Sequence, residues 1–255
     1  MTRLGKQLIY GGAYLAILTL IFVGVYRVFL RPAASCVNGL KDTGEEAVDC
    51  GGVCSNICLP SNLRQIAVKE PLLFSPIPSK LAILTKLQNA NQDIAARSFD
   101  YRVTLLEWGS TSTLRTIKGT EYMYAGEVKY LTLFVDDIEK SMVGDVKTVV
   151  SNVRWVSSKT FYKPELSVQD RKTDITTSTI LVTGRIVNRD TLDLPSVRII
   201  AILQGGGLLT HELGVSATEI ENMTAGSSRE FSITYPFIDG VDPGKTDIIV
   251  SAARP

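Results

Sequence analysis

The stretch that organises this chain is Leu8–Tyr26, which reads LIYGGAYLAILTLIFVGVY and contains no charged residue. As a helix rising about 1.5 Å per residue it would span roughly 28 Å, close to the roughly 30 Å hydrocarbon thickness of a bilayer. Val28–Leu30 can extend this helix if the Arg27 side chain snorkels to the headgroups. We therefore predict a transmembrane helix at residues 8–30, with membrane lipid as its partner.

The residues around this stretch indicate how it crosses the membrane. Arg3 and Lys6 precede it and Arg27 and Arg31 follow it, so the positive charges on the two sides are nearly balanced. Cysteines decide the orientation, because disulfides form outside the cytoplasm. All four cysteines follow the stretch: Cys36, Cys50, Cys54 and Cys58. We expect a single-pass protein of the cell membrane, with residues 1–7 cytoplasmic and the C-terminal domains extracellular or periplasmic.

Alternatives to a single uncleaved anchor stay open. Arg3 and Lys6 could belong to a cleaved signal peptide, and Ala33–Cys36 has the outline of a lipoprotein cleavage site. The apolar run is longer than the apolar part of a typical signal peptide, which favours the anchor. Gly12 and Ala16 form a small-xxx-small pair on one helix face, so a homo-oligomer formed through the anchors is a further alternative.

The composition of the chain excludes some classes of partner. Its 255 residues allow one or two domains beyond the anchor. The formal net charge of +1 gives no electrostatic basis for a nucleic-acid partner, which would require a strongly basic surface. The apolar share of 45% is that of a globular chain, neither a disordered tail nor a polytopic membrane protein.

Residues 31–60 hold a cysteine-rich module that reads CVNGLKDTGEEAVDCGGVCSNIC over residues 36–58. Such a short segment cannot bury a core, so we expect disulfides among its four cysteines, with three pairings open. Calcium is an alternative stabiliser if four oxygen-bearing side chains converge: Asn38, Asp42, Glu45 and Asp49. Zinc held by reduced thiolates is another, although the cysteine spacing is unlike paired zinc knuckles. The simplest interpretation is that the acids only solubilise a cross-linked loop.

This module resembles a small domain of many bacterial extracellular and surface proteins, whose pattern is C-x-[DN]-G-x-x-[DN]-x-x-E-x-x-V-D-C-G-G-x-C-x-x-C. The chain follows the pattern in register from Cys36 to Cys54 and departs from it at the end, where three residues instead of two separate Cys54 from Cys58. The resemblance implies exposure at a surface and implies no reaction.

Beyond residue 60 the apolar residues alternate with a period of two, which is typical of half-buried β-strands. Two runs of common parity are Tyr101–Val103–Leu105 and Val197–Ile199–Ala201–Leu203. No long segment has the pattern of an amphipathic helix. The sequence therefore predicts an all-β region after the anchor.

The all-β region repeats itself at a separation of about 100 residues. Gly126 corresponds to Gly226 and Gly144 to Gly244. Two copies of about 95 residues match the size of an immunoglobulin-like domain. We expect two tandem immunoglobulin-like β-sandwiches at residues 61–158 and 159–255. Because the connection Thr160–Pro164 is short, we expect them end to end with limited freedom.

The second copy resembles the FxLYD-like immunoglobulin-like domains of bacteria and archaea. The residues that carry the resemblance are Val182–Asn188, Val197–Leu203, Leu213–Gly214, Thr224–Gly226 and Phe231–Ile233. The first copy shows the pattern more weakly, at Leu87–Asn89 and Tyr124–Glu127. The resemblance implies an envelope-facing interaction or spacer module. It implies no single activity, because this fold serves many unrelated roles.

The sequence offers no constellation of catalytic residues. His211 is the only histidine, so a metal shell of several histidines cannot form, and we expect no catalytic role for this lone imidazole. Nucleophile elbows, phosphate loops and dinucleotide fingerprints do not occur. We therefore expect a non-enzymatic envelope or cell-surface protein that binds or scaffolds protein partners and needs no cofactor, calcium apart. The alternatives are a structural spacer subunit of a membrane-associated assembly, and a calcium-dependent or carbohydrate-active surface enzyme with converging carboxylates.

Overall fold

The computed structural model describes residues 3–26, 35–54, 56–207 and 211–254. The chain divides into two compact units, Met1–Cys58 and Leu59–Pro255. Strands make up 54% of the chain and helices 12%, so the all-β prediction is confirmed.

The first unit begins with helix α1 (Arg3–Val25). Residues Gly5–Val25 have a mean hydropathy of 2.2, so the helix is long and apolar enough to cross a membrane. Its apolar side chains are exposed, as Leu8 at 73% and Phe22 at 68% illustrate. The last residues of the predicted span, 27–30, lie outside the described residues.

The cysteine module completes the first unit, and the predicted disulfides are confirmed. Cys36 pairs with Cys54, and Cys50 pairs with Cys58. Glycine is required at Gly52, which has a φ of +58° and where an added Cβ would overlap the carbonyl oxygen of Gly44. That carbonyl accepts a hydrogen bond from the N–H of Val53 at 3.0 Å.

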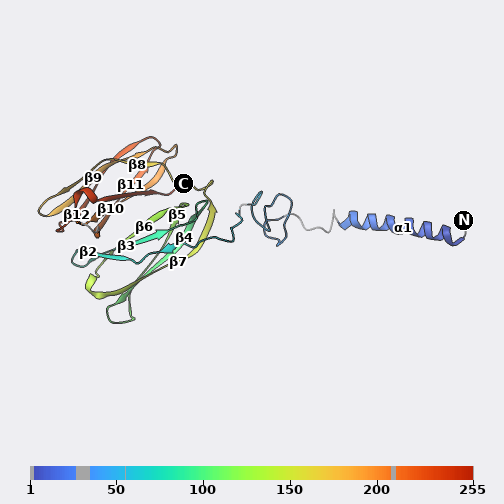
Figure 1. Cartoon of the computed structure of the whole chain (residues 1–255), viewed down its shortest axis with the longest axis horizontal. Helices are drawn as coiled ribbons and strands as arrows, with labels where there is room; N and C mark the ends of the chain where they lie inside the picture. The colour runs from blue at the N-terminus through green and yellow to red at the C-terminus, as the bar shows by residue number, and fades with distance from the viewer. Residues whose placement is uncertain (1–2, 27–34, 55, 208–210, 255) are drawn as a thin grey trace. The chain divides into compact units, whose positions relative to one another are not determined.

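The second unit contains two sandwiches, each made of two antiparallel sheets around a core (Figure 1). The first sheet of sandwich 1 contains β1 (Ala67–Val68), β2 (Leu72–Ile77), β3 (Lys80–Gln88) and β6 (Val128–Asp136), with β3 in the centre. Its second sheet has the order β5 (Thr113–Met123), β4 (Ile94–Glu107) and β7 (Val143–Ser157), and a short 3₁₀ helix, Lys140–Met142, precedes β7. Phe99 and Leu105 of β4 and Leu81 of β3 fill the core between these sheets.

Sandwich 2 repeats this connectivity. One sheet has the order β12 (Ser228–Pro236), β9 (Thr179–Asn188) and β8 (Leu166–Ile175). The other has the order β11 (Glu212–Met223), β10 (Leu194–Gln204) and β13 (Asp247–Ala252), and the 3₁₀ helix Pro243–Lys245 precedes β13. Thus β9 lies between its partners as β3 does, and β10 as β4 does. The repeat read from the sequence is therefore a repeat of strand order.

The two sandwiches pack sheet against sheet, where the sequence suggested an end-to-end arrangement (Figure 1). Residues of β3 alternate between two apolar clusters: Leu81 points into the core of sandwich 1, and Leu84 points towards sandwich 2. On β10, Ile199 points into the core of sandwich 2, and Ile202 points towards sandwich 1. Because both strands are apolar on both faces, each can be buried on both faces.

Candidate functional site: the junction between the sandwiches

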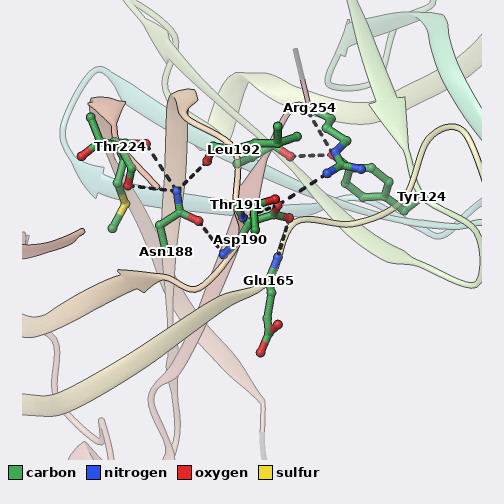
Figure 2. A network of polar contacts seen from close by, with 10 residues as sticks. Tyr124, Glu165, Asn188, Asp190, Thr191, Leu192, Thr224 and Arg254 are labelled. Carbon is green, nitrogen blue, oxygen red and sulfur yellow. Dashed lines mark hydrogen bonds and ion pairs between the residues drawn. The ribbon is translucent and has the colours of Figure 1, made fainter. Parts of the chain in front are cut away.

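A buried asparagine holds together the end of sandwich 2 that lies at the junction (Figure 2). Asn188, the last residue of β9, is 0% exposed. Its Nδ2 donates to the carbonyls of Leu192 at 2.9 Å and Thr224 at 3.1 Å, and its Oδ1 accepts from the N–H of Asp190 at 3.0 Å. One side chain therefore ties the β9–β10 connection to the β11–β12 turn.

Sandwich 1 carries the same device. Asn89 follows β3 and is 1% exposed. Its Nδ2 donates to the carbonyls of Ile94 at 2.8 Å and Tyr124 at 3.0 Å, and its Oδ1 accepts from the N–H of Asn91 at 3.1 Å. In each sandwich, an asparagine at the end of the corresponding strand, β3 or β9, therefore donates to buried carbonyl groups. Without this donor the unpaired carbonyls would destabilise the fold.

Arg254 fastens the segment after the last strand to both sandwiches (Figure 2). Its backbone N–H donates to the Tyr124 hydroxyl at 3.1 Å. Its Nη2 lies 3.5 Å from Oδ1 of Asp190, and the side chains of this ion pair are each only 8% exposed. The guanidinium also lies 3.2 Å from the centroid of the Tyr162 ring, in the connection between the sandwiches. The cation thus has partners that fix its position.

Aromatic rings surround this contact. The Tyr124 hydroxyl donates to the carbonyl of Ala252 at 2.8 Å, which joins sandwich 1 to β13. Its ring stacks on Phe161 with centroids 4.8 Å apart, and Tyr122 meets it edge-on at 5.4 Å. Burial raises the pKa of Tyr122 and of Tyr124 well above the ordinary value for tyrosine. Both phenols are therefore neutral at physiological pH, which suits a hydroxyl that donates and accepts.

A second polar cluster lies beside the first. Nζ of Lys129 is 2.8 Å from Oε2 of Glu121, and these side chains are 7% and 18% exposed. The same ammonium group lies 3.3 Å from the centroid of the Tyr122 ring. From sandwich 2, Arg198 approaches Glu121 to 4.0 Å and donates to the carbonyl of Thr132 at 3.1 Å. Removing one partner of such a cluster would leave a charge largely desolvated and unpaired.

These groups enclose a small cavity of about 150 Å³, which Lys129 and Tyr130 of sandwich 1 and Arg198 and Glu219 of sandwich 2 help to line. At about 30 Å³ per water it has room for only a few water molecules. Lys129 pairs with Glu121, and among the described lining residues the Ser196 hydroxyl donates a hydrogen bond to Glu219. The arrangement is suited to fixing two domains in one orientation.

The structure brings the four predicted calcium ligands together in the cysteine module. The Asp49 carboxylate accepts the N–H groups of Asn38 and Gly39, each at 2.8 Å. The Asp42 carboxylate accepts from Nδ2 of Asn38 at 2.8 Å, and Oε2 of Glu45 accepts the N–H of Asp42 at 3.0 Å. These oxygens thus stabilise the turns of the loop through backbone and amide donors. Calcium binding by these residues stays a prediction.

The sulfur atoms of the module are engaged as well. Sγ of Cys36, Sγ of Cys54 and a carboxylate oxygen of Glu45 lie within 4.8 Å of one another. Because Cys36 and Cys54 are bonded to each other, they are not thiolates, and the four-thiolate zinc alternative does not apply to this oxidised structure. The 3.1 Å contact between Glu45 and Sγ of Cys54 is therefore a packing contact.

The junction residues were not predicted from the sequence, although the sequence contains two signals of a strand that is buried on both faces. Apolar residues stand consecutively at Leu81–Leu84 and at Ile199–Leu203, where a half-buried strand would alternate. No local pattern points to Arg254, whose partners lie up to 130 residues away in the chain. His211, the lone histidine, lies opposite Gly205, whose N–H donates to its carbonyl at 2.9 Å.

Comparison with known proteins adds little to this geometry. No protein-family model matches the chain, and no curated protein matches its sequence. Among solved structures, the chain is similar to red sea bream transglutaminase at 12% sequence identity, over 75% of this chain and 31% of that enzyme, with a TM-score of 0.25. A similarity at this level carries no argument about fold family or activity.

Proposed function

We propose that this chain is a non-catalytic protein of the cell envelope or cell surface, anchored by α1, whose two immunoglobulin-like sandwiches act as one rigid scaffold for protein partners. The observation that carries the proposal is the junction, with a shared apolar cluster of Leu84 and Ile202 and the buried contacts of Arg254. Two sandwiches joined by a flexible tether would need neither the shared apolar cluster nor these buried contacts. A scaffold must hold its binding surfaces at fixed distances, and a buried interface does so.

Two features of the first unit support the location. The helix Gly5–Val25 has the length and hydropathy of a membrane span. The two disulfides, Cys36–Cys54 and Cys50–Cys58, favour an oxidising space outside the cytoplasm for the residues after the helix. In this proposal the helix is a retained single-pass anchor.

The scaffold role is tested with the full chain in the membranes of the cells that produce it. A photo-crosslinking amino acid replaces Ser110 in sandwich 1 or Asp239 in sandwich 2, both exposed. A scaffold gives a reproducible set of protein adducts at one or both sites. Ile202→Asp places a charge in the apolar junction. It should abolish the adducts that require the two sandwiches to be held in a fixed relative orientation.

The matched control is Thr104→Asp, at the corresponding position of β4 in sandwich 1 and outside the junction, which should leave the adducts unchanged. Identical adducts in Ile202→Asp and wild type would refute the rigid scaffold. Location is tested separately, by extraction of the membranes with carbonate and by thiol labelling. Release of an uncleaved chain with free thiols would refute the anchored, oxidised location.

A further inference from the structure

The outer face of the sheet β5–β4–β7 in sandwich 1 is strongly basic. Tyr101 and Val103 of β4 pack in the core, so Arg102 between them points outward, as its exposure shows. Strand register sets Arg102 directly opposite Lys118 of β5. On β7, Val146 and Val150 point into the core, and Lys147 points outward.

A bulge in β7 adds a fourth cation to this face. Asn152 has a φ of +51° and interrupts the ladder with β4. After it, Val153 and Trp155 pack on the core, and Arg154 between them is exposed. We call these four exposed residues the basic face: Arg102, Lys118, Lys147 and Arg154.

Little on the protein neutralises the basic face. In the described part of the chain, none of its four cations lies in an ion pair. The acids that share it are Asp100 and Asp145. Asp100 accepts from the Thr120 hydroxyl at 3.0 Å and from Nδ2 of Asn152 at 2.7 Å, and Asp145 accepts the N–H of Val146 at 2.8 Å. Four cations against two carboxylates contrast with a net charge of only +1 for the whole chain.

The repeat shows that this face of the fold can serve as a docking surface. In sandwich 2, Ile200 lies opposite Ala217 and Ile249, as Arg102 lies opposite Lys118 and Val149 in sandwich 1. Ile200 belongs to the apolar cluster that packs against sandwich 1. The same sheet face is thus apolar where it is covered within the chain and cationic where it is exposed. Like charges directly across strands destabilise a sheet, so folding alone does not account for Arg102 opposite Lys118.

We propose that the basic face binds an acidic polysaccharide, an extended chain that carries repeated carboxylate, sulfate or phosphate groups. Lys147 and Arg154 lie seven positions apart on one strand, at most roughly 23 Å at about 3.3 Å per residue, which spans several charged units of a polymer. A shallow hollow of about 320 Å³ beside Arg102 and Lys118 is lined by the Asp100 carboxylate and also by Thr120, Ser151 and Asn152. Their hydroxyl and amide groups suit hydrogen bonds with a sugar ring.

The charge pattern favours a polysaccharide over a lipid surface. Among the described residues of the face itself, Val149 alone is a strongly exposed large apolar residue, at 56%; the exposed ring of Trp108 lies at the end of the sheet, in the β4–β5 hairpin beside Asp145. A membrane-binding face would present aromatic or apolar side chains for insertion among the headgroups. Binding at the basic face requires neither the anchor nor the rigid junction, so this proposal and the scaffold proposal fail separately.

The test uses the full chain in detergent, with size-defined heparin oligosaccharides and polygalacturonate as probes and neutral dextran as the blank. Counterion release by four cations predicts a slope of about −3 for log K against log salt, or about 60-fold weaker binding at 200 mM than at 50 mM salt. In the variant Arg102→Gln/Lys118→Gln/Lys147→Gln/Arg154→Gln, binding should fall to the level of dextran.

The matched control removes four exposed cations elsewhere, as Lys69→Gln/Lys159→Gln/Arg171→Gln/Arg229→Gln, none of which lies in an ion pair in the described structure. It has the same net charge as the test variant and should keep most of the affinity. An equal loss in both variants, or no binding by the wild type, would overturn the proposal. So would tighter binding to vesicles of phosphatidylglycerol, or to duplex DNA, than to either polysaccharide. Unchanged thermal unfolding of the test variant excludes misfolding as the cause of a loss.

Discussion

Ile202 and Ile199 make a matched pair for testing whether the two sandwiches are one cooperative unit. Both lie on β10, and they are 1% and 0% exposed. Ile199 packs in the core of sandwich 2, whereas Ile202 packs in the junction. Substitution by alanine removes the same atoms at both positions. A fully buried isoleucine reduced to alanine lowers the free energy of unfolding by about 2–5 kcal/mol.

If the junction is as well packed as a core, Ile202→Ala and Ile199→Ala should both lower the free energy of unfolding by this amount. The measurement is urea unfolding of residues 59–255, followed by the fluorescence of Trp108 and Trp155 and by circular dichroism. Thr104→Ala, at the position of sandwich 1 that corresponds to Ile202, should change the free energy of unfolding by less than about 0.5 kcal/mol. A loss below about 1 kcal/mol for Ile202→Ala, or two separate transitions in the wild type, would refute the reasoning.

Three further predictions concern single devices of the fold. Asn188→Ala leaves the carbonyls of Leu192 and Thr224 without their donor, so it should lower the free energy of unfolding by about 2–4 kcal/mol in the same urea assay; a loss under 1 kcal/mol would contradict the role of this side chain. Burial raises the pKa of Tyr122. The contribution of this side chain to the free energy of unfolding is therefore complete below about pH 10 and falls above that pH by about 1.4 kcal/mol per pH unit. Tyr122→Phe should remove this part of the pH dependence of stability, and an unchanged pH dependence in the variant would count against the reasoning. Reduction with dithiothreitol should remove hydrogen-exchange protection at Val53 while Ile202 stays protected, because Leu59–Pro255 contains no cysteine; loss of protection at both would show that the units depend on each other.

The alternation of apolar residues was enough to predict the strands and their class. Val103 and Leu105 of β4, and Ile199 of β10, are buried as their parity requires. The spacing of the glycines predicted the repeat, since Gly126 and Gly226 occupy corresponding turns with φ of +66° and +69°. These features follow from local geometry, which the sequence carries directly.

Other features depend on distances that no local pattern encodes. Three disulfide pairings were open, and the choice of Cys36–Cys54 depends on how the loop folds. The role of Asp49 also depends on how the loop folds. Its carboxylate has the chemistry of a metal ligand, and in the folded loop it accepts two backbone N–H groups. Trp108, which alternation alone would place at a core or rim, is 73% exposed at the β4–β5 hairpin.

The location of the junction follows from a comparison of corresponding strands. In β10 the run Ile199–Leu203 is apolar at every position, and in β3 so is Leu81–Leu84. These two strands carry the faces that meet. In the corresponding strands β4 and β9, the outward positions hold polar residues such as Arg102 and Thr183. Each sandwich therefore has one apolar outer face and one polar outer face, and only the apolar faces can be buried at low cost. Polar outer faces keep a stack of repeats soluble and closed to further stacking. The same asymmetry explains why the apolar faces form the junction and why the basic face is left uncovered in sandwich 1.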